Sequence, residues 1–152
     1  MLASYENKTL IESIREGSVE LAVIIRAGYS RQGVTFVTPD EYSQQLGYMN
    51  RPAGYRIPAH VHNPVPRAVV FTREVLLVRS GRMRVDFYTD AGTYAQSRIL
   101  AAGDVILLAA GGHGFEMLED TEMIEVKQGP YAGLDDKSVI ASVDASHVRL
   151  GE

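Results

Sequence analysis

Two histidines with a single residue between them stand out in the stretch GYRIPAHVH, which ends at His62. Residues two apart in a β-strand point to the same face, so His60 and His62 would both reach one place while Val61 points the other way. Paired imidazoles of this kind can bind a divalent metal ion or move protons. The alternative is an ordinary exposed strand with one polar face.

A carboxylate follows the two histidines, inside an otherwise apolar run. Glu74 shares its strand parity with Leu76 and Val78, so the pattern predicts that it faces the interior. An interior carboxylate is costly unless a cation or a hydrogen-bond network compensates it. The same alternation groups His113 with the apolar Phe115 and predicts a third inward imidazole.

These four side chains are predicted to bind one metal ion. The chain contains no cysteine, so every metal ligand must be histidine, aspartate, glutamate or a neutral oxygen. Three imidazoles and one carboxylate suit Fe(II), Mn(II), Ni(II), Co(II) or Zn(II), with positions left open for substrate or water. The predicted metal ligands are His60, His62, Glu74 and His113.

Each ligand assignment has a simpler competitor. Glu74 could form a surface ion pair with Arg73, Arg82 or Arg84, and His113 could be a turn residue after a pair of glycines. Strand parity places Arg73 on the face opposite to Glu74, which favours an inward role for the carboxylate.

Short strands dominate the part of the chain that carries these residues. From residue 55 onward, strand-like pieces alternate with turn residues at a spacing near 8 to 12, which is typical of an antiparallel sandwich or barrel. There is no room for the crossover helices that a parallel sheet requires. Strands are expected over 20–28, 33–39, 55–62, 73–80, 82–89, 96–102, 104–109, 113–119 and 121–128.

Two short helices are expected before this region. Leu10, Ile11 and Ile14 recur at helical spacing within 9–16, and the pattern ends at a glycine. Thr38 followed by proline and Glu41 resembles a capping box that would begin a short helical turn over 41–46.

Composition excludes several classes of protein. With 152 residues, 22% charged residues and a net charge of -4, the chain lacks the basic excess of a nucleic-acid-binding surface. Its longest apolar run, 105–110, is too short to cross a bilayer, and no signal-like segment begins the sequence. We therefore expect a cytoplasmic protein with no nucleic-acid or membrane partner.

The spacing of these residues resembles the cupin family. Gly54, His60, His62, Glu74 and Gly81 look like the first cupin motif, and the stretch from Gly103-Asp104 through Ala109 and Gly111 to His113 looks like the second. Eleven residues separate His62 from Glu74, more than the family usually has, and Ala109 stands where a proline is usual. The resemblance implies an all-β fold, a single antiparallel jelly-roll barrel, with the short N-terminal helices at its periphery. It also implies that His60, His62, Glu74 and His113 bind one metal ion.

The resemblance sets the expected organisation of the chain. Residues 1–53 would supply strands and short helices that pack on the barrel or on a partner subunit. Residues 54–130 would form the barrel core, and 131–152 would extend the same domain. Cupin barrels commonly pair through edge strands, so we expect a homodimer.

Two functions from different classes fit these expectations. The first is a small-molecule enzyme, a metal-dependent oxygenase or an isomerase or epimerase, with a substrate that is carbohydrate-related by analogy to cupins of this size. The second is a non-catalytic cupin that binds a small molecule, with a structural metal or none. Fold alone does not decide between them.

Overall fold

The computed structural model describes residues 9–151, which form two compact units. Ser30–Thr72 make up the smaller unit, and the larger unit combines the residues before Ser30 with those from Arg73 onward. The predicted all-β class is confirmed, because every pairing between two named strands is antiparallel and the only helices among these residues are two short 3-10 turns. None of the described helices is long and apolar enough to cross a membrane.

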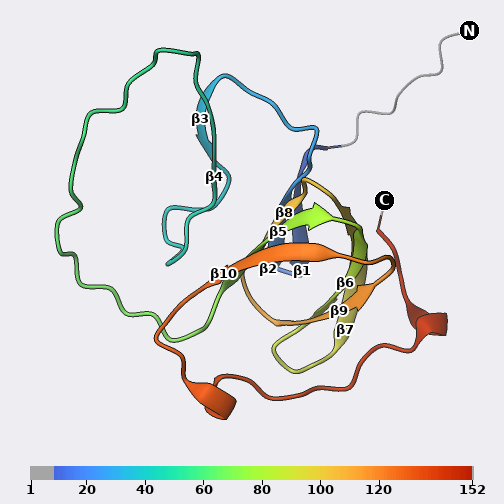
Figure 1. Ribbon diagram of the computed structural model, residues 1–152. Helices are drawn as coiled ribbons and strands as arrows, with labels where there is room; N and C mark the ends of the chain where they lie inside the picture. The colour runs from blue at the N-terminus through green and yellow to red at the C-terminus, as the bar shows by residue number, and fades with distance from the viewer. Residues whose placement is uncertain (1–8, 152) are drawn as a thin grey trace, which may run out of the picture. The chain divides into compact units, whose positions relative to one another are not determined.

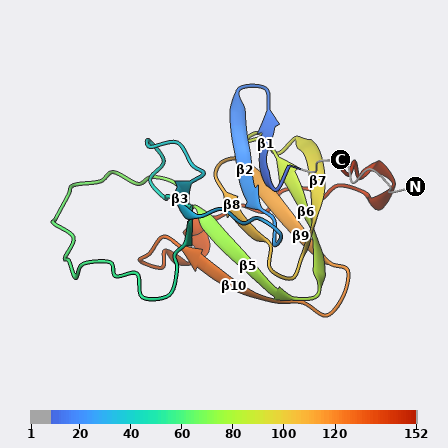
Figure 2. The same ribbon diagram turned by 90° about the horizontal axis from the view of Figure 1, so that it is seen from above.

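The larger unit contains two sheets, which Figure 2 shows from above. The first sheet has five strands in the order β1-β2-β8-β5-β10, and the second has three in the order β7-β6-β9. The five strands are β1 (Ile11–Glu16), β2 (Val19–Ile25), β8 (Val105–Leu108), β5 (Glu74–Ser80) and β10 (Glu122–Lys127). The three are β7 (Tyr94–Ala101), β6 (Arg82–Tyr88) and β9 (Gly112–Met117).

Alternating apolar side chains from both sheets fill one shared core. Leu76 and Val78 of β5 are fully buried, as are Val85 and Phe87 of β6. Because successive side chains of a strand point to opposite faces, Leu76 and Val78 share one face of β5, and Val85 and Phe87 share one face of β6. The described sheets remain separate and do not close into a barrel, so the antiparallel all-β class holds while the jelly-roll barrel stays a prediction.

An ionic network links β1 to the β7 side of the core. Arg26 donates from Nε to Glu12 Oε1 at 2.6 Å and from a terminal nitrogen to Asp104 Oδ2 at 2.9 Å. Arg98 of β7 donates to the other oxygen of Glu12 at 3.0 Å.

The expected helix over 9–16 is wrong, because these residues contain β1, which pairs with β2. A segment this short gains little from helical periodicity alone, whereas pairing in a sheet buries Ile14 completely and places Glu12 beside Arg26. The two strands are joined at Gly17, whose φ of 58° is readily adopted by glycine.

The smaller unit contains one hairpin, formed by β3 (Gly33–Phe36) and β4 (Gly47–Asn50). The helix expected over 41–46 is absent from it. Thr38 does act as a cap, but of a loop: its hydroxyl accepts a hydrogen bond from the Leu46 backbone and donates to Gln45. Local side-chain hydrogen bonds of this kind compete with helix formation.

The strand expected over 55–62 is also wrong, since residues 51–70 contain no strand. Pro58 lies in the middle of the expected strand and has no N–H to donate to a neighbour. Pro52, Pro64 and Pro66 flank it and impose the same restriction.

The C-terminal residues belong to the larger unit. After η1 (Gly133–Asp136) and η2 (Ala145–His147), Leu150 forms a single parallel bridge with Ser97 of β7. The backbone N–H groups of Val143 and Arg149 donate to the hydroxyls of Tyr88 and Tyr94. This segment therefore extends the domain that contains both sheets.

Candidate functional site

Glu74 begins β5 and faces the core side of the five-stranded sheet. It has the same strand parity as Leu76 and Val78, each of which is only 1% exposed. The inward orientation predicted from sequence alternation is therefore confirmed. Its side chain is partly buried at the end of the core.

His113 reaches the same place from the second sheet. It lies directly opposite Phe87 in the pairing of β6 with β9, and directly opposite residues of a sheet share a face. Its Nε2 lies 3.0 Å from Oε2 of Glu74, and its ring lies 5.2 Å from that of Phe115. The structure therefore brings together two predicted ligands from strands of different sheets.

The contact between these side chains affects the protonation of Glu74. A hydrogen bond from His113 lowers the pKa of Glu74 below its ordinary value of 4.5, while burial acts in the opposite direction. The positive charges of Lys127 and Lys137 lower it further. Glu74 is consequently a carboxylate at neutral pH, which is the form that binds a cation.

The competing ion-pair interpretation of Glu74 does not match the ion pairs that Arg82 and Arg84 form. Arg82 pairs with Glu119, Arg84 pairs with Asp86 and Glu116, and Arg73 donates to a backbone carbonyl. Neither Arg82 nor Arg84 is described as an ion-pair partner of Glu74.

His60 and His62 lie in the smaller unit and remain adjacent although no strand holds them. Their ring centroids are 5.2 Å apart, with the rings at 76° to each other. Nδ1 of His60 lies 2.9 Å from the Pro58 carbonyl oxygen, which can only accept a hydrogen bond. Nδ1 is therefore the donor, so the neutral imidazole would have its lone pair on Nε2, which is the tautomer that a metal ligand of this type needs.

The four predicted donors thus form two adjacent pairs, one in each unit. No group of three or more His, Asp or Glu side chains that could hold a metal ion occurs within 9–151. Two neighbouring ligands on an octahedral ion, with bonds of about 2.1 Å, lie about 3.0 Å apart. The separation of Glu74 and His113 fits that arrangement, as well as fitting a hydrogen bond.

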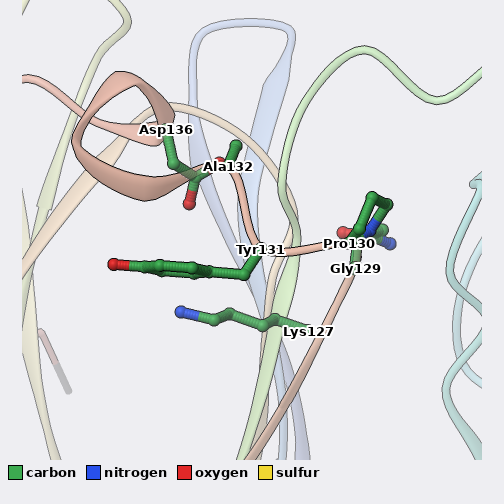
Figure 3. A pocket seen from close by; sticks show the side chains of 7 residues that line it. Lys127, Gly129, Pro130, Tyr131, Ala132 and Asp136 are labelled. Carbon is green, nitrogen blue, oxygen red and sulfur yellow. The ribbon is translucent and has the colours of Figure 1, made fainter.

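A charged residue that sequence reasoning missed lies beside Glu74. Lys127 of β10 is directly opposite Glu74 in the sheet, and its Nζ lies 3.3 Å from Glu125. It also lines an open hollow of about 230 Å³ whose rim includes Tyr131 and Asp136. In Figure 3 the side chains of Lys127 and Tyr131 extend in the same direction. Lys127 lies four residues after the partly buried Met123, so both side chains point to the same face of β10. This spacing is the sequence signal that could have placed Lys127 on the side of Glu74.

The remaining histidine belongs to neither pair. His147 is strongly exposed in η2 and lies 3.9 Å from Asp144. Comparison with family models, with curated proteins and with solved structures found no match to this chain.

Proposed function

We propose that this chain is a cupin-type small-molecule protein in which His60, His62, Glu74 and His113 bind one divalent transition-metal ion. The observation that carries the proposal is the contact between Glu74 and His113 at the end of the core. Two strands of different sheets deliver an ionised carboxylate and an imidazole to one place, both partly buried.

The pair formed by Glu74 and His113 cannot hold a metal ion in a catalytic site by itself. Such sites usually have three protein ligands and an open position, so His60 and His62 are required to complete the set. The adjacency of the two rings and the orientation of His60 suit this role. A bound ion would act as a Lewis acid or bind dioxygen next to a substrate.

The side chains around the pair suit a small polar substrate. Phe115 provides an apolar wall next to His113, and Lys127 provides a cation opposite Glu74. The lysine can orient an anionic or strongly polar group, and the wall can exclude water from one side of it. A carbohydrate-related substrate and an oxygenase or isomerase reaction are proposed from the resemblance to cupins.

The alternative is a binding protein without catalysis. The open hollow beside Lys127 and Tyr131 favours it, because this hollow offers a charge and an aromatic surface without any metal ion. A ligand at a hundred times its dissociation constant adds about 2.7 kcal/mol of stability. Thermal stabilisation by a sugar phosphate or nucleotide sugar, with no product formed in the presence of metal, would favour this alternative.

Equilibrium dialysis against Co²⁺, followed by elemental analysis, tests the metal site. We expect about one Co²⁺ per chain in the unaltered protein and a loss of binding in His60→Ala and His113→Ala. His147→Ala is the matched control, since it removes an exposed imidazole of no assigned function and should leave binding intact. Full Co²⁺ occupancy in His113→Ala would refute the ligand assignment.

A further inference from the structure

The segment 51–71 of the smaller unit, here called the arm, leaves every one of its side chains exposed. Many of these side chains are large and apolar, with Val61 86% and Val70 88% exposed. Single exposed apolar residues are common on protein surfaces, but many of them within one short segment indicate a contact surface. The exposed apolar side chains of the arm include Tyr55, Ile57, Val61, Val65, Val70 and Phe71.

The arm makes only local hydrogen bonds in the described structure. They join Tyr55 to Pro52, His60 to Pro58 and Arg67 to Val65. Its backbone groups are therefore available to another surface. Its prolines also restrict the conformations of the free arm, which reduces the entropy lost when it binds.

The arm is also basic. No aspartate or glutamate occurs between Glu41 and Glu74, although the whole chain has a net charge of -4. Arg51 stacks over the ring of Tyr55 at 4.4 Å. No carboxylate within 30–72 forms an ion pair with Arg56 or Arg67. A partner surface that is acidic and apolar would complement the arm.

The larger unit has such a surface on β9, β10 and the turn between them. Both strands have a neighbour on one side only, so each leaves one edge of its backbone unpaired by a named strand. Asp120 and Glu122 form no ion pair in the part of the chain that the structure describes. Exposed apolar side chains occur along both strands of this β9–β10 surface: Phe115 and Met117 on the core-facing side of β9, Leu118 after it, and Ile124 and Val126 on the outer face of β10.

We propose that the arm of one chain binds to the β9–β10 surface of a second copy, and that two copies exchange arms in this way. The arm and the surface are complementary in charge, and both carry exposed apolar side chains. The arm is also long enough, since a stable interface takes about 20–30 residues from each side. On the basis of the function proposed above, the exchange supplies His60 and His62 of one copy to Glu74 and His113 of the other.

Sedimentation velocity across a range of protein concentrations tests the exchange without reference to metal. We expect a dimer of twice the 16.7 kDa chain mass. The double variant Arg56→Glu and Arg67→Glu should raise the dimer dissociation constant roughly tenfold or more, and Glu122→Lys in the same chain should recover part of the loss. Arg31→Glu is the matched control, an exposed arginine of the same unit outside the arm. A monomer, or a dimer that the double variant leaves unchanged, would overturn the proposal.

Complementation between two defective chains tests whether the donors come from different copies. One chain carries His60→Ala and His62→Ala, and the other carries Glu74→Gln and His113→Ala. Alone, neither should retain Co²⁺. After mixing and re-equilibration, half of the dimers contain one chain of each kind, and each of these has one intact site. We therefore expect about a quarter of the Co²⁺ per chain that the unaltered protein binds.

The outcomes separate this inference from the proposed function. Absence of Co²⁺ binding in the unaltered protein refutes the metal site, while sedimentation still decides whether the arms are exchanged. Co²⁺ binding in the unaltered protein without recovery in the mixture means that all four ligands come from one chain, which overturns the exchange.

Discussion

Replacing Asp104 tests whether the ionic network between β1 and β7 holds the larger unit together. Asp104 is only 5% exposed, and its carboxylate accepts three hydrogen bonds. The donors are a terminal nitrogen of Arg26 at 2.9 Å, the Ala27 N–H at 2.8 Å and the Ala101 N–H at 3.0 Å. Asp104→Ala removes the acceptor for all three.

The expected cost follows from these contacts. A buried donor left without a partner costs about 1–3 kcal/mol, and breaking a buried ion pair costs about 3–5 kcal/mol. Arg26 keeps Glu12 and the Ile99 carbonyl as acceptors, so we expect the low end, about 3 kcal/mol. Asp104→Asn retains one acceptor oxygen and should cost about half as much.

Urea unfolding measures these differences in free energy. The matched control is Glu119→Ala, which breaks the pair with Arg82, where both side chains are half-exposed and the N to O distance is 3.4 Å. Such surface pairs contribute less than about 1 kcal/mol. If Asp104→Ala costs no more than the control, the network does not stabilise the fold in the way described.

Three further predictions concern the end of the core that carries the candidate site. In metal-free protein, the unaltered chain should be more stable than Glu74→Gln at neutral pH, because folding lowers the pKa of Glu74. This difference in the free energy of unfolding should disappear as the pH falls from about 5 toward 2. A difference that persists in acid would contradict the hydrogen bond from His113. Gly111→Ala places a Cβ 2.2 Å from the Tyr88 carbonyl oxygen at a φ of 70°, so urea unfolding should show that the free energy of unfolding falls by about 3 kcal/mol. In the control Gly54→Ala the new Cβ meets no atom within 4 Å, and the fall should be about 1–2 kcal/mol. Equal losses in the two variants would argue against the clash. Adding Co²⁺ at a hundred times its dissociation constant should stabilise the protein by about 2.7 kcal/mol and a chelator should reverse this, whereas an unchanged melting temperature would argue against metal binding to the folded state.

Strand alternation predicted correctly which face of β5 points to the core. Glu74 could be assigned to the core side from Leu76 and Val78 alone, and the structure places it there beside His113. The contact of Glu74 with His113 could not be predicted in the same way. It depends on which strands of the two sheets meet, and local sequence patterns contain no information about that.

The errors have physical causes that particular residues illustrate. In β1 the helical spacing of its isoleucines is overridden by pairing with β2, which buries Ile14 and brings Glu12 to Arg26. In 55–62 the alternation of apolar and polar residues is as regular as in a strand, yet Pro58 cannot donate to a ladder. The two histidines stay adjacent there through local geometry, with Nδ1 of His60 held by the Pro58 carbonyl.

The two proposals together require that metal binding and dimer formation influence each other. If each site combines His60 and His62 of one copy with Glu74 and His113 of the other, only the dimer has a complete ligand set. Linkage is reciprocal, so Co²⁺ must tighten the dimer by the same factor by which dimer formation tightens Co²⁺ binding. Co²⁺ affinity should therefore fall on dilution of the protein, and the double variant Arg56→Glu and Arg67→Glu should lose Co²⁺ affinity although it alters no ligand. A Co²⁺ affinity that is independent of protein concentration would show that one chain completes the site, even if the protein is a dimer.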